Sequence, residues 1–141
     1  MKFTFNTTID YFSREPRKLF LIDGLGAALT TFSLFFVLRH YHDYFGMPAN
    51  ILTYLSAIGL LYFAYSMSCY FLLKDYWAPF IRIIGICNFL YCILTITFLH
   101  THYNNLTRIG LAYFLAEILT IMLIVYIELR VANMLKTQKT D

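Results

Sequence analysis

The sequence predicts an all-α protein, an antiparallel four-helix transmembrane bundle with both termini in the cytoplasm. Of its 141 residues, 60% are hydrophobic and only 13% are charged. Soluble proteins average about 45–50% apolar and about 25% charged residues. The apolar residues gather in four runs of helical length, and the basic residues lie mostly on one side of the resulting topology. These observations exclude a water-soluble domain of ordinary composition.

One domain with three parts is expected for a chain of this length. A membrane-spanning helix needs about 20 mainly apolar residues to cross a hydrocarbon core of about 30 Å. Four stretches satisfy this requirement, at residues 19–38, 51–73, 80–99 and 109–131. The predicted membrane domain is therefore residues 19–131, between a cytoplasmic N-terminal arm at residues 1–18 and a cytoplasmic tail at residues 132–141.

The N-terminal arm mixes charged residues with apolar ones and contains no continuous apolar core of the signal-peptide type. The first span is therefore expected to act as an uncleaved signal anchor. The apolar residues of the arm can lie on the membrane interface, and a solvated, partly disordered arm is the alternative. These residues are Phe3, Phe5, Ile9, Tyr11 and Phe12.

The first span follows Pro16, a residue that suits the first turn of a helix. Asp23 lies about 6 Å inside this span at 1.5 Å per residue. Together with Gly26, Thr30 and Ser33 it forms a small, polar stripe on one side of the helix, which favours close approach to another helix. The residues 39–50 then form an external loop with turn residues before the second span.

The middle spans carry further polar residues. Tyr62 and Tyr65 lie near the centre of the second span, and the segment 74–79 forms a short internal turn. In the third span, Arg82 lies near the cytoplasmic end and Asn88 near the middle. Residues 100–108 form the second external loop.

The last span contains a carboxyl group at its centre. Nineteen positions separate Arg108 from Glu128, and Glu117 is the ninth of them. As a helix, these positions extend about 28 Å. A carboxylate at the bilayer centre costs about 2.5–3.5 kcal/mol on insertion scales unless it is protonated, paired or turned toward protein or water. We therefore expect the other helices to surround Glu117 with polar groups.

The distribution of basic residues predicts the orientation in the membrane. Cytoplasmic loops of membrane proteins carry an excess of Lys and Arg. The predicted external side holds two basic residues, Arg39 and Arg108, and the predicted cytoplasmic side holds nine. These nine are Lys2, Arg14, Arg17, Lys18, Lys74, Arg82, Arg130, Lys136 and Lys139.

A central polar layer around Glu117 is the first candidate site. Counting depth along each helix places its members within a turn or two of one plane. They are Thr30, Thr31, Tyr62, Tyr65, Asn88 and Glu117. Glu117 is either a neutral, hydrogen-bonded link between helices or a group that loads and releases a proton. In both cases it is expected to point into the bundle and contact Asn88 or a tyrosine.

A second set of polar residues lies at the cytoplasmic ends of the spans, namely Asp23, Arg82, Glu128 and Arg130. Asp23 and Arg82 occupy similar depths on helices that run in the same direction, which permits an ion pair. Alternatively, Arg82 extends its head group to the lipid headgroups, as long basic side chains near helix ends usually do.

All four histidines lie on the predicted external side, as the pairs His40-x-His42 and His100-x-His102. Imidazoles are good ligands for zinc, copper, nickel and iron. A metal or haem site is therefore one hypothesis, and interfacial histidines without metal are the other. No cofactor is predicted otherwise. The three cysteines lie inside apolar runs, without a C-x-x-C pair, and are expected to pack as small apolar residues.

A shift of the sequence by sixty residues aligns the two histidine pairs and also aligns Tyr54-Leu55 with Phe114-Leu115. This short match suggests a duplication, with each half of the chain forming one helical hairpin.

The strings LFLIDGLGA, FGMP, YFLAEIL and VYIEL resemble small bacterial four-span integral membrane proteins. The resemblance covers nearly the whole chain and implies a place in the bacterial inner membrane, but it implies no activity. The chain is also similar to small multidrug-resistance transporters in its four spans and single midplane glutamate. Here the glutamate lies in the last span instead of the first, and the external loops are longer, so only the architecture is comparable.

Three functions are consistent with these features. The first is a non-enzymatic accessory or interaction component, because no catalytic motif is present. The second is a small proton-coupled transporter that uses Glu117 and works as a homo-oligomer. The third is metal or haem binding by the external histidines. The expected partners are the lipid bilayer and a second copy or another membrane protein. Nucleic acid is not expected, because the basic residues form no continuous patch.

Overall fold

The computed structural model describes residues 2–137, with side chains described from residue 6 onward. All regular secondary structure in this part of the chain is helical. The elements are α1 (Lys2–Arg14), α2 (Pro16–Phe32), the π-helix η1 (Ser33–Leu38), α3 (His42–Phe45), α4 (Ala49–Leu72), α5 (Trp77–Thr101) and α6 (Arg108–Thr137). The predicted all-α class is therefore confirmed.

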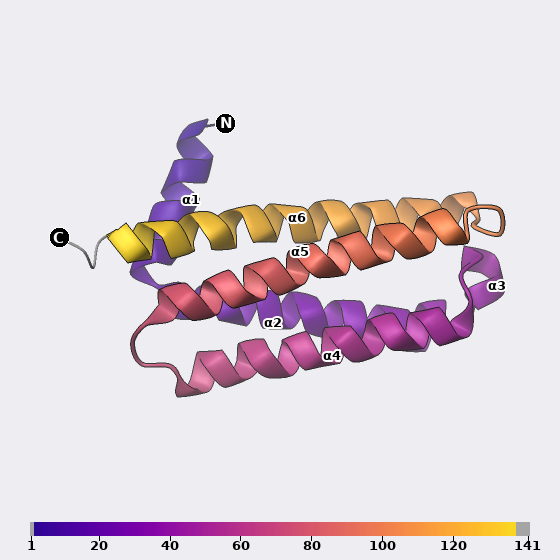
Figure 1. Ribbon diagram of the computed structural model, residues 1–141, viewed down its shortest axis with the longest axis horizontal. Helices are drawn as coiled ribbons and strands as arrows, with labels where there is room; N and C mark the ends of the chain where they lie inside the picture. The colour runs from indigo at the N-terminus through magenta and orange to yellow at the C-terminus, as the bar shows by residue number, and fades with distance from the viewer. Residues whose placement is uncertain (1, 138–141) are drawn as a thin grey trace.

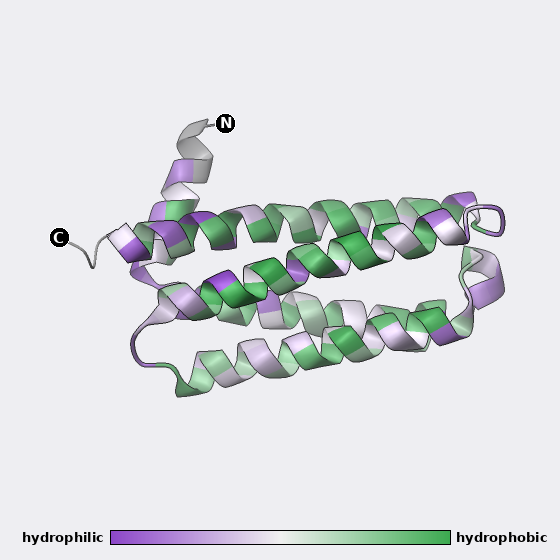
Figure 2. Cartoon of the chain, in the orientation of Figure 1, coloured by the Kyte–Doolittle hydropathy of each residue, from purple (hydrophilic) through white to green (hydrophobic). Residues whose placement is uncertain are grey.

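Four helical segments are long and apolar enough to cross a membrane, namely Pro16–Leu38, Ala49–Leu72, Trp77–Thr101 and Arg108–Thr137. Only 17–39% of the most apolar window of each is buried inside the protein. The rest of this apolar surface faces outward, with Leu29 68% and Leu119 72% exposed. Figure 2 shows hydrophobic residues along the length of the long helices. These are the properties of a multi-pass integral membrane protein.

The long helices pack as two pairs. Figure 1 shows that the chain folds back after each long helix. α2 packs mainly along α4, and α5 packs mainly along α6, whereas contacts between these pairs are few. We call the pairs the α2–α4 unit and the α5–α6 unit. Each unit comes from one half of the chain, the arrangement that the proposed duplication predicts, although the duplication itself stays a hypothesis.

The end of the molecule that contains α3, here called the α3 end, is closed by hydrogen bonds to the start of α6. The Thr107 hydroxyl donates to the Tyr44 carbonyl at 2.6 Å, and the Thr107 N–H donates to the Phe45 carbonyl at 3.3 Å. Gly46 has a φ of +73°, a left-handed conformation that glycine adopts without strain. A Cβ at Gly110 would overlap the backbone of Phe45. Both glycines therefore permit the backbones to meet here.

At the opposite end, called the α1 end, α1 packs against α6. Ile9 and Phe12 are buried in an apolar cluster that also contains Val131 and Ala132. The residues expected on the membrane interface thus include two that face protein, while Tyr11 is 46% exposed. The side chains of Phe3 and Phe5 lie outside the described residues. The predicted tail, residues 132–141, begins inside a helix, because α6 continues to Thr137, and residues 138–141 lie outside the described part.

The predicted first span ends in a π-helix. In η1 the backbone widens, and the Arg39 N–H donates to the Leu34 carbonyl five residues earlier at 3.0 Å. π-helical turns occur frequently at functional sites. The sequence analysis did not predict this segment, nor did it predict the short helix α3 inside the expected external loop.

Candidate functional site

A cavity of about 310 Å³ lies between the α2–α4 unit and the α5–α6 unit. Leu29 on α2 and Ala116 and Thr120 on α6 line it and are exposed. The cavity therefore reaches the surface between α2 and α6, where the units make few contacts. The cavity lies about halfway along the long helices, because the residues that line it lie near the middle of each helical segment.

The lining of the cavity is largely apolar and aromatic, with a few polar groups. Two carboxyl groups line it, those of Asp23 on α2 and Glu117 on α6. Three tyrosines, Tyr62, Tyr91 and Tyr113, supply aromatic surface. Within the described residues, no Lys, Arg or His lines the cavity. The cavity is thus an apolar space with an excess of acidic groups.

Glu117 lines the cavity and binds a tyrosine. The Tyr91 hydroxyl donates to Glu117 Oε1 at 3.3 Å. Glu117 Oε2 is buried and has no hydrogen-bond partner within residues 6–137, although the Thr30 hydroxyl lies near enough to interact with the carboxyl group. Tyr91 is 4% exposed, and its ring meets the Tyr62 ring edge to face at 6.2 Å. The expected polar neighbour of Glu117 is therefore Tyr91, a residue that the sequence analysis did not select.

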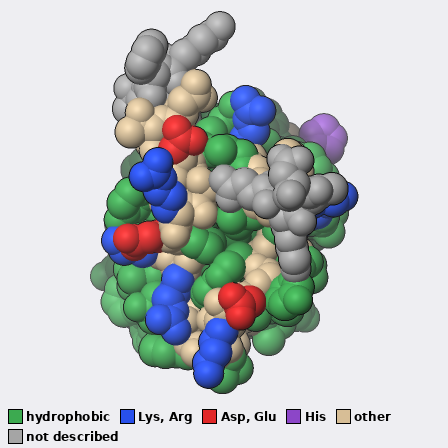
Figure 3. All heavy atoms as spheres, turned by 90° about the vertical axis from the view of Figure 1, so that its left-hand side faces the viewer, with side chains coloured by type: hydrophobic (Ala, Val, Ile, Leu, Met, Phe, Trp, Pro, Cys, Tyr) green, Lys and Arg blue, Asp and Glu red, His purple; other side chains and the backbone are tan. Residues whose placement is uncertain are grey.

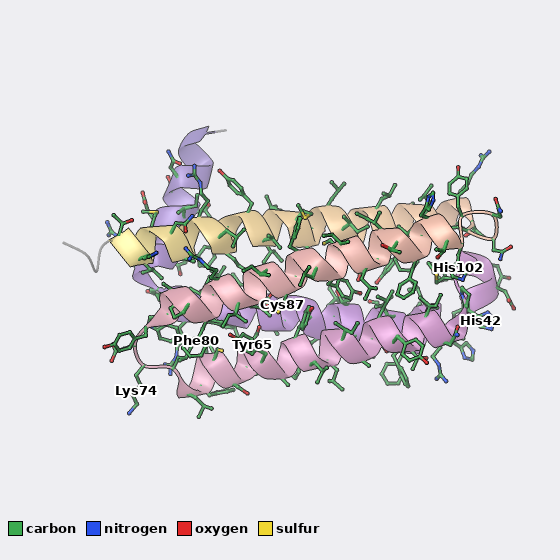
Figure 4. All side chains as sticks on the ribbon, in the orientation of Figure 1. His42, Tyr65, Lys74, Phe80, Cys87 and His102 are labelled. Carbon is green, nitrogen blue, oxygen red and sulfur yellow. The ribbon has the colours of Figure 1, made fainter. Side chains whose placement is uncertain are left out.

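The two tyrosines that were selected have other partners. The Tyr62 hydroxyl donates to the Cys87 carbonyl at 2.9 Å, and the Tyr65 hydroxyl donates to the Phe80 carbonyl at 3.2 Å. Figure 4 shows Tyr65 on α4 facing the part of α5 that carries Phe80 and Cys87. Both tyrosines connect the two helix units through backbone carbonyls, and neither hydroxyl donates to Glu117 in the structure.

A second group of polar side chains lies deeper, at the wall of the cavity. Asn88 Nδ2 donates to Asp23 Oδ1 at 2.7 Å and to Glu128 Oε2 at 3.5 Å. The Ser66 hydroxyl donates to Asp23 Oδ2 at 2.5 Å. Asp23 is 5% exposed and Glu128 0% exposed. We call Asp23, Ser66, Asn88 and Glu128 the acid cluster. Asn88, which was assigned to the layer around Glu117, belongs to this cluster.

The ion pair between Asp23 and Arg82 is not formed. Arg82 Nη2 donates to Asn133 Oδ1 at 2.7 Å instead. Arg130 Nε donates to the Tyr126 hydroxyl at 3.3 Å. Among residues 6–137 the ion pairs are Lys18–Glu15 and His42–Asp43. Of the two alternatives for Arg82, the ion pair is therefore excluded: Asp23 turns toward Ser66 and Asn88, whereas the head group of Arg82 reaches Asn133 near the C-terminal end of α6.

The histidines lie at the α3 end, where Figure 4 shows His42 on α3 and His102 at the end of α5. His42 Nδ1 is 3.1 Å from Asp43 Oδ1, and the His40 ring meets the Tyr41 ring. His102 Nδ1 is 3.1 Å from the Phe98 carbonyl oxygen. His100 is exposed. In the described part of the chain, no group of three or more His, Cys, Asp or Glu side chains could hold a metal ion.

Comparisons of the chain with protein-family models, with curated proteins and with solved structures found no match.

Sequence reasoning missed the main property of Glu128, which is its complete burial beside Asp23. One signal was present. Residues eleven apart on a helix are separated by three turns and about 20°, so Glu128 lies on the same face as Glu117. The face that buries one carboxyl group therefore also buries the other. Ser66 also belongs to the site, because its hydroxyl is a partner of Asp23.

Proposed function

We propose that the four long apolar segments form an antiparallel transmembrane bundle with both termini in the cytoplasm of a bacterium. The exposed apolar surface of the long helices supports this proposal, because such a surface needs lipid as its solvent. Figure 3 looks onto the α1 end and shows Lys and Arg side chains distributed over it. This charge distribution supports the orientation, since basic residues accumulate on the cytoplasmic side.

We further propose that the protein is a small proton-coupled transporter and that its cavity binds a small lipophilic cation. One observation carries this proposal. The carboxyl groups of Asp23 and Glu117 line a largely apolar cavity, and no basic side chain among the described residues lines it. A cation in such a site gains an opposite charge in a medium of low dielectric constant. The faces of the tyrosine rings add cation–π attraction.

The size of the cavity limits the ligand. A volume of about 310 Å³ is at the lower end of the range for small-molecule sites, about 300–1,000 Å³. It suits one aromatic ring with a compact cationic group. The opening between α2 and α6 faces the bilayer in the proposed arrangement, so the ligand would enter from the lipid.

Binding is tested with an isosteric pair of probes, benzyltrimethylammonium and neutral neopentylbenzene. The protein is placed in lipid nanodiscs, and binding of each probe is measured by equilibrium dialysis against empty nanodiscs. We expect saturable binding of the cation only. Glu117→Gln is expected to reduce it at least tenfold, which corresponds to about 1.4 kcal/mol. Asp75→Asn, in an exposed turn, is the control. Equal binding of both probes would refute a cation site.

Transport is tested separately in proteoliposomes. Uptake of benzyltrimethylammonium driven by an outward proton gradient is expected for the unchanged protein and is expected to be lost in Glu117→Gln. Binding without gradient-driven uptake would refute transport while leaving the cation site in place.

The second candidate function is that of an accessory or interaction component. The apolar rim of the cavity opening supports it. The rim of the cavity carries the exposed apolar side chains of Leu29 on α2 and Ala116 on α6, and a transmembrane helix of a second copy or of another membrane protein can pack between them. Cysteines introduced at Leu29 and Ala116 in a variant without native cysteines distinguish the accessory role from the transporter. Cross-linking between copies that blocks probe binding would favour the accessory role.

A further inference from the structure

The carboxyl groups of Asp23 and Glu128 lie close together at the wall of the cavity. Asn88 Nδ2 donates to one oxygen of each, at 2.7 Å for Asp23 Oδ1 and 3.5 Å for Glu128 Oε2. A side-chain interaction also joins the two acids directly. Two carboxylates that share a buried site repel each other strongly when both are charged. The pair therefore needs either a cation or a proton.

No basic side chain supplies the missing positive charge within the described residues. The groups facing the pair are Ser66 and Tyr62 from α4 and Asn88 from α5, and all of them are uncharged donors. Three basic residues at the α1 end have other partners. Arg17 donates to the Tyr70 carbonyl, Arg82 to Asn133 and Arg130 to Tyr126.

The hydrogen bonds distinguish the two acids. Both oxygens of Asp23 accept hydrogen bonds, Oδ2 from Ser66 and Oδ1 from Asn88. This arrangement satisfies an ionised carboxylate. Glu128 is 0% exposed, and its Oε1 receives no hydrogen bond from any residue in the range 6–137. A buried carboxyl oxygen without a donor is explained if it carries a hydrogen itself and donates it.

We propose that Asp23 and Glu128 form a proton-binding site, in which Glu128 carries one proton and donates it to the carboxylate of Asp23. The pair then has a net charge of −1. Asp23 and Asn88 line the cavity, so the proton exchanges with the cavity through Asp23. When the pair releases its proton, one proton leaves through the cavity and both carboxylates are charged. This site does not require that a lipophilic cation binds in the cavity.

The experiment is infrared spectroscopy of the purified protein in nanodiscs at neutral pH, using the carbonyl stretch of protonated carboxyl groups. Only three glutamates are present, Glu15, Glu117 and Glu128. Glu15 is exposed and paired with Lys18. In the Glu117→Gln background, a protonated glutamate band therefore reports on Glu128. We expect such a band, and we expect it to shift when the glutamate side chains are labelled with ¹³C.

The labelling requires no change at Glu128, so it remains informative if a variant at that position does not fold. Adding Glu128→Gln to the same background is expected to abolish the band. Adding Asp23→Asn is expected to shift it, because a neutral amide replaces the charged acceptor. Asp75→Asn is the matched control and should leave the band unchanged.

The proposal is overturned if the Glu117→Gln protein shows no protonated-carboxyl band at neutral pH, or if the band does not respond to glutamate labelling. A band that disappears when sodium replaces potassium in the buffer would also overturn it, because the pair would then hold a metal cation. Failure of the benzyltrimethylammonium-binding experiment leaves these outcomes unaffected, so the proton site and the proposed transport are tested independently.

Discussion

Tyr62 on α4 donates its hydroxyl hydrogen to the Cys87 carbonyl on α5 at 2.9 Å, and this bond connects the α2–α4 unit to the α5–α6 unit beside the cavity. Tyr62 also lines the cavity and packs edge to face against Tyr91. Tyr91 in turn binds Glu117. The width of the cavity and the position of Glu117 are thus fixed by one short series of contacts between tyrosines.

Replacing Tyr62 by Phe removes this bond and retains the ring. We expect a loss of about 0.5–1.5 kcal/mol of stability, the usual net contribution of one hydrogen bond, and a lower melting temperature in detergent. Tyr54→Phe is the control, because Tyr54 lies on the same helix and is 63% exposed. Equal melting temperatures for the two variants would show that the Tyr62 bond does not hold the units together.

Gly59 lies at the contact between α4 and α2. A Cβ at this position would be 2.6 Å from Thr31 Oγ1, whereas a Cβ at Gly26 would have no atom within 4 Å. Overpacking of this kind costs about 1–3 kcal/mol. We expect Gly59→Ala to lower the stability by that amount and Gly26→Ala to raise it by up to about 1 kcal/mol, the difference in helix propensity.

Both glycine variants are compared by thermal unfolding in the same detergent. The order of melting temperatures should be Gly26→Ala, wild type and Gly59→Ala. A Gly59→Ala protein as stable as the wild type would mean that α2 and α4 can separate at Thr31 without loss.

Gly46 is subject to two constraints, a positive φ and the close approach of another backbone segment. Substitution by Ala tests both constraints, and substitution by Asn mainly tests the second. Its φ of +73° is tolerated by Asn better than by Ala. Its missing side chain also leaves room for the backbone of Asn105. We expect both Gly46→Ala and Gly46→Asn to be strongly destabilised, because each adds a Cβ. If Gly46→Asn unfolds at the wild-type temperature, the close approach of the α3 segment to Asn105 is not required.

Among residues 6–137, Asn88 donates hydrogen bonds to both Asp23 and Glu128. Replacement by Leu leaves Asp23 with one donor fewer, and an unsatisfied buried group costs about 1–3 kcal/mol or more when charged. We expect Asn88→Leu to lower the melting temperature clearly. Asn133→Leu, which removes an exposed partner of Arg82, should change it little. The reverse order would contradict a structural role of the acid cluster.

The proposed orientation is tested by labelling single cysteines with a membrane-impermeant maleimide in intact bacteria. The native cysteines are first replaced by serine or alanine. Tyr103 and Asp75 are both exposed and lie in turns at opposite ends of α5. We expect Tyr103→Cys to react in intact cells and Asp75→Cys to react only after permeabilisation. The opposite pattern would invert the topology.

The four long helices were predictable because each apolar run is bounded by charged or turn residues such as Pro16 and Arg108. Their number and approximate position follow from composition alone. The end of α6 was not predictable in this way. Polar residues after Val131, such as Asn133 and Lys136, end an apolar run but do not end a helix, since both are tolerated in a helix exposed to water.

The candidate site was predictable only in part. Counting residues gives the depth of a side chain along a helix, and it placed Asn88 within a turn or two of the depth of Glu117. It does not give the rotation of each helix about its axis, which depends on packing with its neighbours. For this reason Asn88 was one of the two expected contacts of Glu117, with a tyrosine as the other, whereas its partners in the structure are Asp23 and Glu128. The π-helix η1 has no local sequence signature from which it could be inferred.

The packing of α1 against α6 has a mechanical consequence. In Figure 1, α1 projects sideways from the long helices, while Ile9 and Phe12 hold it to the last turns of α6. With its 30 residues, α6 is about 45 Å long and exceeds a hydrocarbon core of about 30 Å. If the long helices follow the bilayer normal, α1 lies parallel to the membrane surface among the headgroups. Its contact with α6 then sets the insertion depth of the protein and the tilt of its long helices.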